Sequence, residues 1–309
     1  MNESRLVDTF LRLVQVPGPT YEERAIADAI KAELASMGLQ AEEDRAGEEI
    51  GGNAGNLIVN IPGNVPGAPA LLFAAHMDTV DLAVGVRPQM QDGVIRSDGS
   101  TALGGDNRAG VAEILEAVRE VQENHLPHGD LQLVFTVGEE GGLLGARALD
   151  PGKLKARYGY AVDVFKANQI YIQGRHLLGD PETPITAEEV RRFKETGENA
   201  PIIEPPPDTE LTPAEREILD FTTQAQQDLG MTPEFRRLEF AGTDAIALRR
   251  HGLNAISLGA GENRPHSTSE FVRVEDMVNS TRLIRALIHK AALAGAVGGP
   301  VGAALAARA

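Results

Sequence analysis

The chain of 309 residues contains no cysteine and no tryptophan. Without cysteine there are no disulfide bonds, thiolate nucleophiles or sulfur-ligated zinc sites, so any bound metal must be held by His, Asp and Glu. Basic residues are also few, since 29 Lys and Arg stand against 45 Asp and Glu, giving a net charge of -16. Nucleic acids and anionic membranes are bound through clustered basic residues, so this charge argues against both as partners.

Long hydrophobic runs are also scarce. The N-terminal stretch 1–18 has no basic segment ahead of a long apolar core and instead has the pattern of an amphipathic helix, so we expect a cytoplasmic protein. The uncharged tract 291–307 is mostly alanine with four glycines and a proline. It is too short and too weakly apolar to predict a membrane span. We expect residues 294–309 to form an Ala/Gly-rich tail.

Hydrophobic residues make up 42% of the chain, which is enough for a packed core. Strand-like and helical patterns alternate, as is typical of a helix-covered, mostly parallel sheet. We therefore predict an α/β fold with a mixed, mostly parallel central sheet flanked by helices. The expected strands are 56–61, 70–75, 131–137, 158–164 and 255–259, and the main expected helices are 21–38, 107–124, 213–230 and 274–293.

The alternation is interrupted between residues 168 and 207. Prolines crowd the stretches 180–186 and 201–207 around a short helical pattern. Because proline lacks a backbone donor and interrupts regular structure, we expect a surface insertion here rather than core sheet. The predicted division is one domain made of residues 1–167 and 208–293, with the insertion 168–207 between its two parts.

Ionisable residues gather just beyond the expected strands. In open α/β sheets, ligands bind in the crevice outside the carboxyl ends of the strands, so polar residues at these positions are candidates for a site. The candidates are His76 and Asp78 in 75-AHMDTVD-81, Asp106 in 103-LGGDNRAG-110, Glu139 and Glu140 in 139-EEGG-142, Asp163 in 161-AVDVF-165 and His266 in 262-ENRPHSTSE-270.

Two of the histidines and three of the carboxylates suit two divalent ions better than one. These are His76, His266, Asp106, Glu140 and Asp163. Two-metal hydrolytic sites hold their ions roughly 3.5–4 Å apart and need a bridging carboxylate. Asp106 is the candidate bridge, because the preceding glycines allow a close approach of the backbone. We assign Glu140 as a ligand and Glu139 as the general base, an order that spacing alone does not fix. Asp78 would accept the other N–H of His76 and orient its ring.

Each motif alone also has an ordinary structural explanation. An Asp before a helix, like Asp106, is typically an N-cap, and 139-EEGG-142 is typical of a charged loop. Asp163 differs, because an unpaired carboxylate inside an apolar strand is costly to bury and requires a partner. The remaining histidines are expected at the surface or in capping positions: His125, His128, His251 and His289.

Taken together, the motifs resemble the peptidase T branch of the co-catalytic dizinc peptidases, relatives of aminoacylase and the glutamate carboxypeptidases. The resemblance covers residues 5 to about 165 and about 210 to 290. Its motifs occur in the order of that branch, which makes the set far more specific than any one of them. They are 53-NAGNLIVNIPG-63, 75-AHMDTVD-81, 103-LGGDNRAG-110, 133-LVFTVGEEGGLLGA-146, 161-AVD-163, 242-GTDA-245 and 265-PHSTSE-270.

The resemblance implies a metal ligand set. His76 and Asp163 would bind one ion, Glu140 and His266 would bind the other, and Asp106 would bridge them. The cofactors would be two divalent metal ions, with zinc expected and cobalt or manganese as alternatives.

The resemblance also implies a mechanism and a substrate class. Glu139 would act as base and then as proton donor to the leaving amine, while Asp78 would orient His76. We expect a dizinc exopeptidase that cleaves short peptides as a tripeptidase-like aminopeptidase. Two alternatives stay open: a metal-dependent deacylase of N-acyl amino acids, which could use the same centre, and a metal-binding protein with little activity.

The chain departs from this branch in the lid. Its members insert a lid and dimerisation domain of roughly one hundred residues or more, which is domain-sized, between the Asp163 strand and the 242-GTDA-245 loop. Here residues 164–241 must also supply the helix at 213–230, so a full lid does not fit. Arg175 and His176 are candidates for substrate contacts, with a solvated loop as the alternative. We expect a monomer, or a dimer through another surface.

Overall fold

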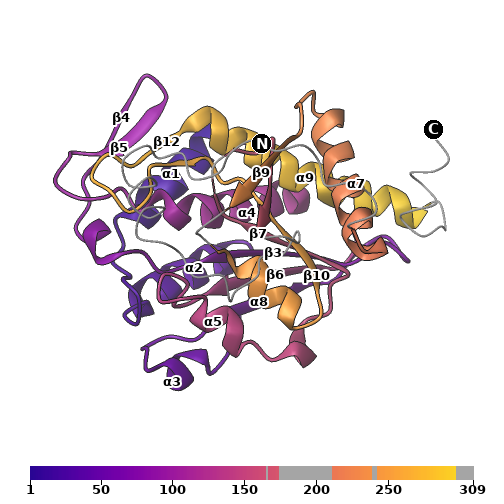
Figure 1. Ribbon diagram of the computed structural model, residues 1–309, viewed down its shortest axis with the longest axis horizontal. Coiled ribbons are helices and arrows are strands. Elements are labelled where there is room, and N and C mark those ends of the chain that lie inside the picture. Colours follow the sequence, from indigo (N-terminus) through magenta and orange to yellow (C-terminus); the bar gives the residue numbers. More distant parts are fainter. Residues whose placement is uncertain (165, 174–210, 239–241, 297–309) are drawn as a thin grey trace.

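The structure is a computed structural model and describes residues 1–164, 166–173, 211–238 and 242–296. Within these ranges, no helix combines the length and the apolar character needed to cross a bilayer. The elements follow the chain from the N-terminal helix to the long C-terminal helix (Figure 1).

A large mixed sheet forms the centre of the fold. Its middle is parallel, with β6 (Leu131–Thr136), β3 (Leu71–His76), β7 (Tyr158–Val162) and β10 (Asn254–Leu258) as successive neighbours. This arrangement confirms the predicted fold class. Four further strands bring this sheet to eight strands among the described residues. Antiparallel β2 (Leu57–Ile61) lies beside β6, and β1 (Glu42–Glu43) pairs with β2 in the antiparallel sense. On the other side, antiparallel β8 (Gln169–Gln173) lies beside β10, and β9 (Glu234–Leu238) pairs in parallel with β8.

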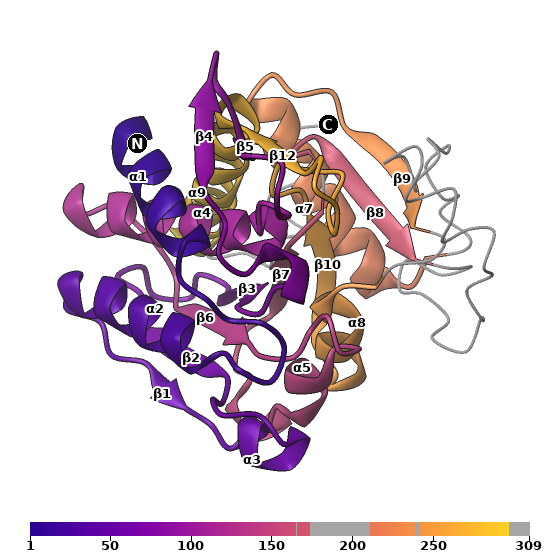
Figure 2. The ribbon, with the colours of Figure 1, turned by 90° about the vertical axis from the view of Figure 1, so that its left-hand side faces the viewer.

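A second, small sheet lies at one end of the molecule (Figure 2). Its described strands are antiparallel, in the order β11 (Glu262–Asn263), β12 (Phe271–Arg273), β5 (Val94–Ser97) and β4 (Pro88–Gln91). The strand patterns of the sequence did not predict this sheet, because its strands are short and partly polar. It joins the hairpin of β4 and β5 to the segment that carries His266.

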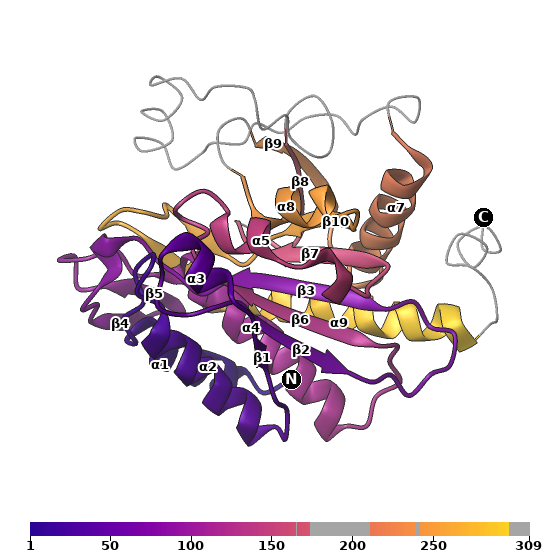
Figure 3. The same ribbon diagram turned by 90° about the horizontal axis from the view of Figure 1, so that it is seen from below.

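Helices cover both faces of the large sheet (Figure 3). One face carries α1 (Glu3–Val14), α2 (Arg24–Ser36), α4 (Gly105–Glu123) and α9 (Val274–Ala296). The opposite face carries α5 (Leu144–Ala148) and α8 (Asp244–Arg250), next to α3 (Ala46–Ile50). Helix α7 (Pro213–Asp228) packs against α9 and β10. Its N-terminus is fixed by a capping box between Thr212 and Glu215.

Alternate side chains of the strands enter two separate cores, as the period-two geometry of a strand requires. Phe73 and Tyr160 face the layer of α1, α4 and α9, where their rings stack with centroids 5.5 Å apart. Ala74 and Ala161 face the layer of α5 and α8. Burial on both faces fixes the register of the central strands, and with it the positions of the residues at their ends.

The main predicted elements are present. The five predicted strands correspond to β2, β3, β6, β7 and β10, and the four predicted helices to α2, α4, α7 and α9, with ends that differ by a few residues. In the predicted insertion 168–207, residues 169–173 form β8 of the large sheet. Residues 174–207, with the candidates Arg175 and His176, lie outside the described residues, as do residues 297–309 of the predicted tail 294–309. The first three residues of that predicted tail, 294–296, belong to α9. The division into domains stays a prediction.

Helix α4 packs closely against the end of β7 at Gly110. A Cβ atom at this position would lie 2.2 Å from the carbonyl oxygen of Val162 and 2.4 Å from Oδ1 of Asn107, so only glycine fits. The side-chain amide of Asn107 donates to the same carbonyl oxygen at 2.8 Å. This contact fixes the start of α4, which carries Asp106, against the end of β7, which precedes Asp163.

We expect Gly110→Ala to lower the free energy of unfolding by about 1–3 kcal/mol, the usual cost of overpacking. Urea unfolding followed by circular dichroism measures this change. Gly52→Ala is the matched control, because its Cβ would lie at an ordinary 3.5 Å from the nearest backbone atoms of Tyr21. The control should change stability by less than about 0.5 kcal/mol. Equal stabilities of the two variants would contradict the proposed close contact.

Glu113 lies in the middle of α4 and is fully buried. Neither of its carboxylate oxygens has a hydrogen-bond partner among the described residues. Burial raises the pKa of Glu113 well above its ordinary value, and repulsion from Asp276 raises it further. The folded protein therefore keeps this proton at pH values where the unfolded chain has lost it.

We expect Glu113→Gln to make stability less dependent on pH. The folded protein binds one proton more than the unfolded chain above the ordinary Glu pKa of 4.5. The native free energy of unfolding therefore falls by up to about 1.4 kcal/mol per pH unit until the raised pKa is reached. Glutamine does not ionise, so the stability of the variant relative to the native protein should grow as the pH rises from about 5. Urea unfolding across this range measures the difference, and a constant difference would contradict the expectation.

Candidate metal centre

Ionisable side chains converge at the carboxyl edge of the large sheet. Strands β6, β3 and β7 are parallel neighbours, so their carboxyl ends meet at this edge. The start of α4 and the loop between β11 and β12 reach the same place. The residues that converge are His76 at the end of β3, Glu139 and Glu140 after β6, Asp163 after β7, Asp106 at the start of α4 and His266 between β11 and β12.

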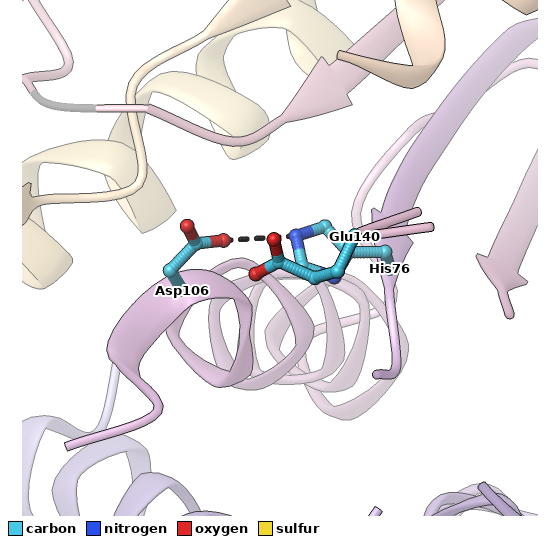
Figure 4. A group of neighbouring side chains, drawn as sticks. All are labelled: His76, Asp106 and Glu140. Atoms are coloured by element: carbon cyan, nitrogen blue, oxygen red, sulfur yellow. Dashed lines mark hydrogen bonds and ion pairs between the residues drawn. The ribbon is translucent and has the colours of Figure 1, made fainter. Parts of the chain in front are cut away.

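Asp106 lies between the two histidines. Its Oδ1 is 2.9 Å from Nε2 of His76, and its Oδ2 is 2.9 Å from Nε2 of His266. Figure 4 shows Asp106 facing His76, with Glu140 beside them. Oε1 of Glu140 lies 2.8 Å from Nε2 of His266, and Oδ2 of Asp163 lies 3.9 Å from Nε2 of His76. Each histidine therefore has its own carboxylate, and Asp106 is shared.

Asp78 lies behind His76 and is fully buried. Its Oδ1 is 3.4 Å from Nδ1 of His76, and its backbone carbonyl oxygen lies 3.0 Å from the same nitrogen. The same carboxylate accepts hydrogen bonds from the backbone N–H groups of Glu139 at 2.9 Å and Glu140 at 3.1 Å. The hydroxyl of Thr20 donates to it at 2.9 Å. Asp78 thus ties the ring of His76 to the loop that carries both glutamates.

Glu139 points its carboxyl group into the same cluster, with Oε2 3.9 Å from Nε2 of His76. Burial raises the pKa of Glu139 well above its ordinary value, and His76 opposes this shift. The nearby charges of Asp163, Glu140 and Asp244 raise the pKa of Glu139 further. A carboxyl group with a raised pKa can accept and return a proton during a reaction.

The other members of the cluster show the same crowding of negative charge. Burial raises the pKa of Asp163 to about 8; His76 opposes this rise, and Asp106 adds to it. Burial would lower the pKa of His266, but Asp106 and Glu140 raise it to about 11. Burial likewise opposes charging of His76, yet the surrounding carboxylates raise its pKa well above its ordinary value. The cluster therefore favours bound positive charge.

Sequence reasoning did not single out Glu270, a buried residue just after the predicted ligand His266. Its Oε2 accepts hydrogen bonds from the backbone N–H groups of Leu103 at 2.8 Å and Gly104 at 2.9 Å. Its Oε1 accepts one from the N–H of Asp106 at 2.9 Å. Glu270 therefore anchors the loop that presents Asp106. The only signal in the sequence was its place at the end of the motif 265-PHSTSE-270.

Asp244 and Glu262 are two further buried carboxylates that sequence reasoning did not assign to the site. Asp244 begins α8 and accepts a hydrogen bond from the hydroxyl of Thr136 at the end of β6. Burial raises the pKa of Asp244 to about 6, although the hydrogen bond from Thr136 opposes this. Asp244 lies in 242-GTDA-245, a motif noted in the sequence without a role for this residue.

The donor atoms fit divalent cations. Among the described residues, two groups have ligand atoms that all lie within 4.8 Å of one another: His76 with Asp106 and Glu140, and Asp106 with Asp163 and Glu262. Imidazole nitrogens with carboxylate oxygens, and no sulfur, suit zinc, cobalt and manganese. A cation would also neutralise buried carboxylates that otherwise repel one another.

Comparisons with known proteins agree with this geometry. The chain matches Peptidase family M20/M25/M40 over residues 72–290. The Bacillus subtilis protein YqjE is 29% identical over 94% of this chain and 100% of its own length. Peptidase T of Escherichia fergusonii is 34% identical in an alignment of 142 positions that covers 35% of this chain and 35% of its own. The crystal structure of aminopeptidase PepT from Bacillus cereus is 27% identical, with a TM-score of 0.78 over 94% of this chain and 99% of that chain.

The comparison with YqjE also bears on the lid. The alignment extends over 370 positions, more than the 309 residues of this chain, so part of YqjE has no counterpart here. This agrees with a reduced lid. The family match spans every residue that converges at the sheet edge, from His76 to His266. The chain therefore belongs to peptidase family M20/M25/M40 and is a metallopeptidase similar to peptidase T.

Proposed function

We propose that the chain is a two-metal aminopeptidase that hydrolyses short peptides, such as tripeptides, from their N-terminus. The observation that carries this proposal is the position of Asp106, which turns one carboxylate oxygen to each histidine at 2.9 Å. A carboxylate shared in this way is what two closely spaced cations require. The similarity to a structure named as an aminopeptidase, PepT of Bacillus cereus, supports this choice of substrate.

The proposed ligands divide into two sets around Asp106. His76 and Asp163 would hold one ion, and His266 and Glu140 would hold the other. The 2.8 Å between His266 and Glu140 supports the second pair, whereas His76 lies 3.9 Å from Asp163 and is also grouped with Glu140. Zinc is the expected metal, and cobalt or manganese would bind the same nitrogen and oxygen donors. When bound, such ions supply polarisation of the scissile carbonyl group and a nucleophilic water at neutral pH.

Glu139 is the proposed general base. Its buried carboxyl group lies beside the ligands, and its raised pKa suits a group that takes a proton from the attacking water and passes it to the leaving amine. Asp78 is the proposed positioning residue. Because Asp78 accepts the N–H groups of Glu139 and Glu140 and lies against Nδ1 of His76, it holds base and ligands in one arrangement.

The first test is metal removal and return. Chelator-treated protein should bind about two zinc, cobalt or manganese ions per chain, as the two-metal site requires. Hydrolysis of free tripeptides should be lost with the metal and regained with it. Elemental analysis and separation of the released amino acids measure both results. Absence of stoichiometric metal binding would contradict the proposal, and hydrolysis of N-acetylated tripeptides in preference to free ones would favour the deacylase alternative instead.

The second test separates the base from the ligands. Glu139→Gln should lower kcat by about 10²- to 10⁴-fold, the usual contribution of a general base, while the metal content stays unchanged. Glu49→Gln is the control, since Glu49 is exposed on α3, and it should keep native kcat. A Glu139→Gln enzyme that binds metal and keeps native kcat would refute the assignment of the base.

A further inference from the structure

Glu262 is a buried carboxylate for which the proposed mechanism has no role. The residue is 1% exposed and lies in β11. Its Oε2 accepts a hydrogen bond from the backbone N–H of Val164 at 3.2 Å. Its Oε1 is buried and has no hydrogen-bond partner among the described residues. Because an uncompensated buried carboxylate is costly, this oxygen calls for a partner outside the protein chain or for a proton.

The backbone holds Glu262 against the end of β7. The backbone N–H of Asp163 donates to the carbonyl oxygen of Leu258 at 2.8 Å. The backbone N–H of Ala260 donates to the carbonyl oxygen of Val164, also at 2.8 Å. These hydrogen bonds extend the pairing of β7 with β10 beyond the sheet. The N–H of Val164 then donates to Glu262 itself. The position of Glu262 beside Asp163 is therefore set by main-chain hydrogen bonds.

Glu262 lies close to two of the proposed metal ligands, Asp106 and Asp163. One carboxylate oxygen each from Asp106, Asp163 and Glu262 lies within 4.8 Å of the other two. His76 is grouped with Asp106 and Glu140, and its Nε2 lies 3.9 Å from Oδ2 of Asp163. Burial raises the pKa of Glu262 well above its ordinary value, and the charges of Asp106 and Asp163 raise it further. Three carboxylates at this separation repel one another unless positive charge lies between them.

We propose that Glu262 is a further ligand of the ion that His76 and Asp163 hold, a proposal that rests on the two-metal function above. This ion then has one imidazole and three carboxylates around it, counting the shared Asp106. The other ion has one imidazole and two carboxylates, from His266, Glu140 and Asp106.

The extra carboxylate makes the two sites unequal. Zinc favours four ligands with nitrogen among them, whereas manganese accepts more ligands and prefers oxygen. The site with Glu262 is therefore the more favourable of the two for manganese. A protein supplied with both metals should carry manganese next to Asp163 in preference to the position next to His266.

Manganese binding to the chelator-treated full-length chain tests this inference. Glu262→Gln keeps the size of the side chain and removes its charge. We expect manganese affinity at one of the two sites to fall by at least about tenfold, the lower end of the effect of altering a metal-site residue. Titration calorimetry, with electron paramagnetic resonance of free manganese, measures the affinity of each site. Zinc affinity at the other site should change little.

Glu113→Gln is the matched control. It also removes an unpaired, buried carboxylate, but Glu113 belongs to neither ligand group, so this variant should bind manganese as the native protein does. Thermal unfolding gives a second readout. Added manganese should raise the Tm of the native protein and of the control more than that of Glu262→Gln, because ligand binding stabilises the folded state.

The outcomes separate this inference from the proposed function. Two manganese ions bound with native affinity by Glu262→Gln would overturn the ligand role of Glu262 and leave the two-metal function standing. No metal bound by the native protein would overturn both. Glu262→Asp keeps the charge and shortens the side chain, so it should also lose affinity at one site. If the glutamine variant does not fold, native affinity in the aspartate variant overturns the inference.

Discussion

Mutual repulsion among buried carboxylates at the carboxyl edge of the large sheet is the constraint on which the rest of the structure depends. Burial raises the pKa values of Glu139, Asp163 and Glu262, and their carboxylate neighbours raise them further. Such a cluster stays in place only if the surrounding backbone is rigid and the charge is compensated. The two buried faces of the sheet supply the rigidity.

The buried carboxylates at this edge of the sheet are of two kinds, which differ in the hydrogen bonds that they accept from the protein. Asp78 accepts two backbone N–H groups and a hydroxyl, and Glu270 accepts three backbone N–H groups. These two carboxylates accept hydrogen bonds within the protein at both oxygens and hold loops in place. Glu262 keeps one buried oxygen without a hydrogen bond among the described residues, and Asp163 stands close to it. Carboxylates of the second kind are the ones that a cation would compensate.

Sequence patterns predicted the parts of the fold that repeat along the chain. The central strands and main helices followed from periodicity, and His76 and Asp163 followed from their places at strand ends. Glu262 and Glu270 could not be found in this way, because their surroundings are made by hydrogen bonds to segments far away in the sequence. The strands of the small sheet are too short for a period to be visible. The sequence also did not show which of Glu139 and Glu140 lies in close contact with a histidine. The fold brings Glu140 into contact with His266.

The pairing of β7 with β10 has a consequence for how the protein is made. His76, Asp106 and Asp163 leave the ribosome early, whereas β10, Glu262 and His266 come near the end of the chain. Domains generally fold as units, so a domain whose last strands have not yet been made stays incomplete. A growing chain therefore contains Asp106, Glu139, Glu140 and Asp163 well before Glu262 and His266 are made. The complete candidate centre therefore cannot form until synthesis has passed His266.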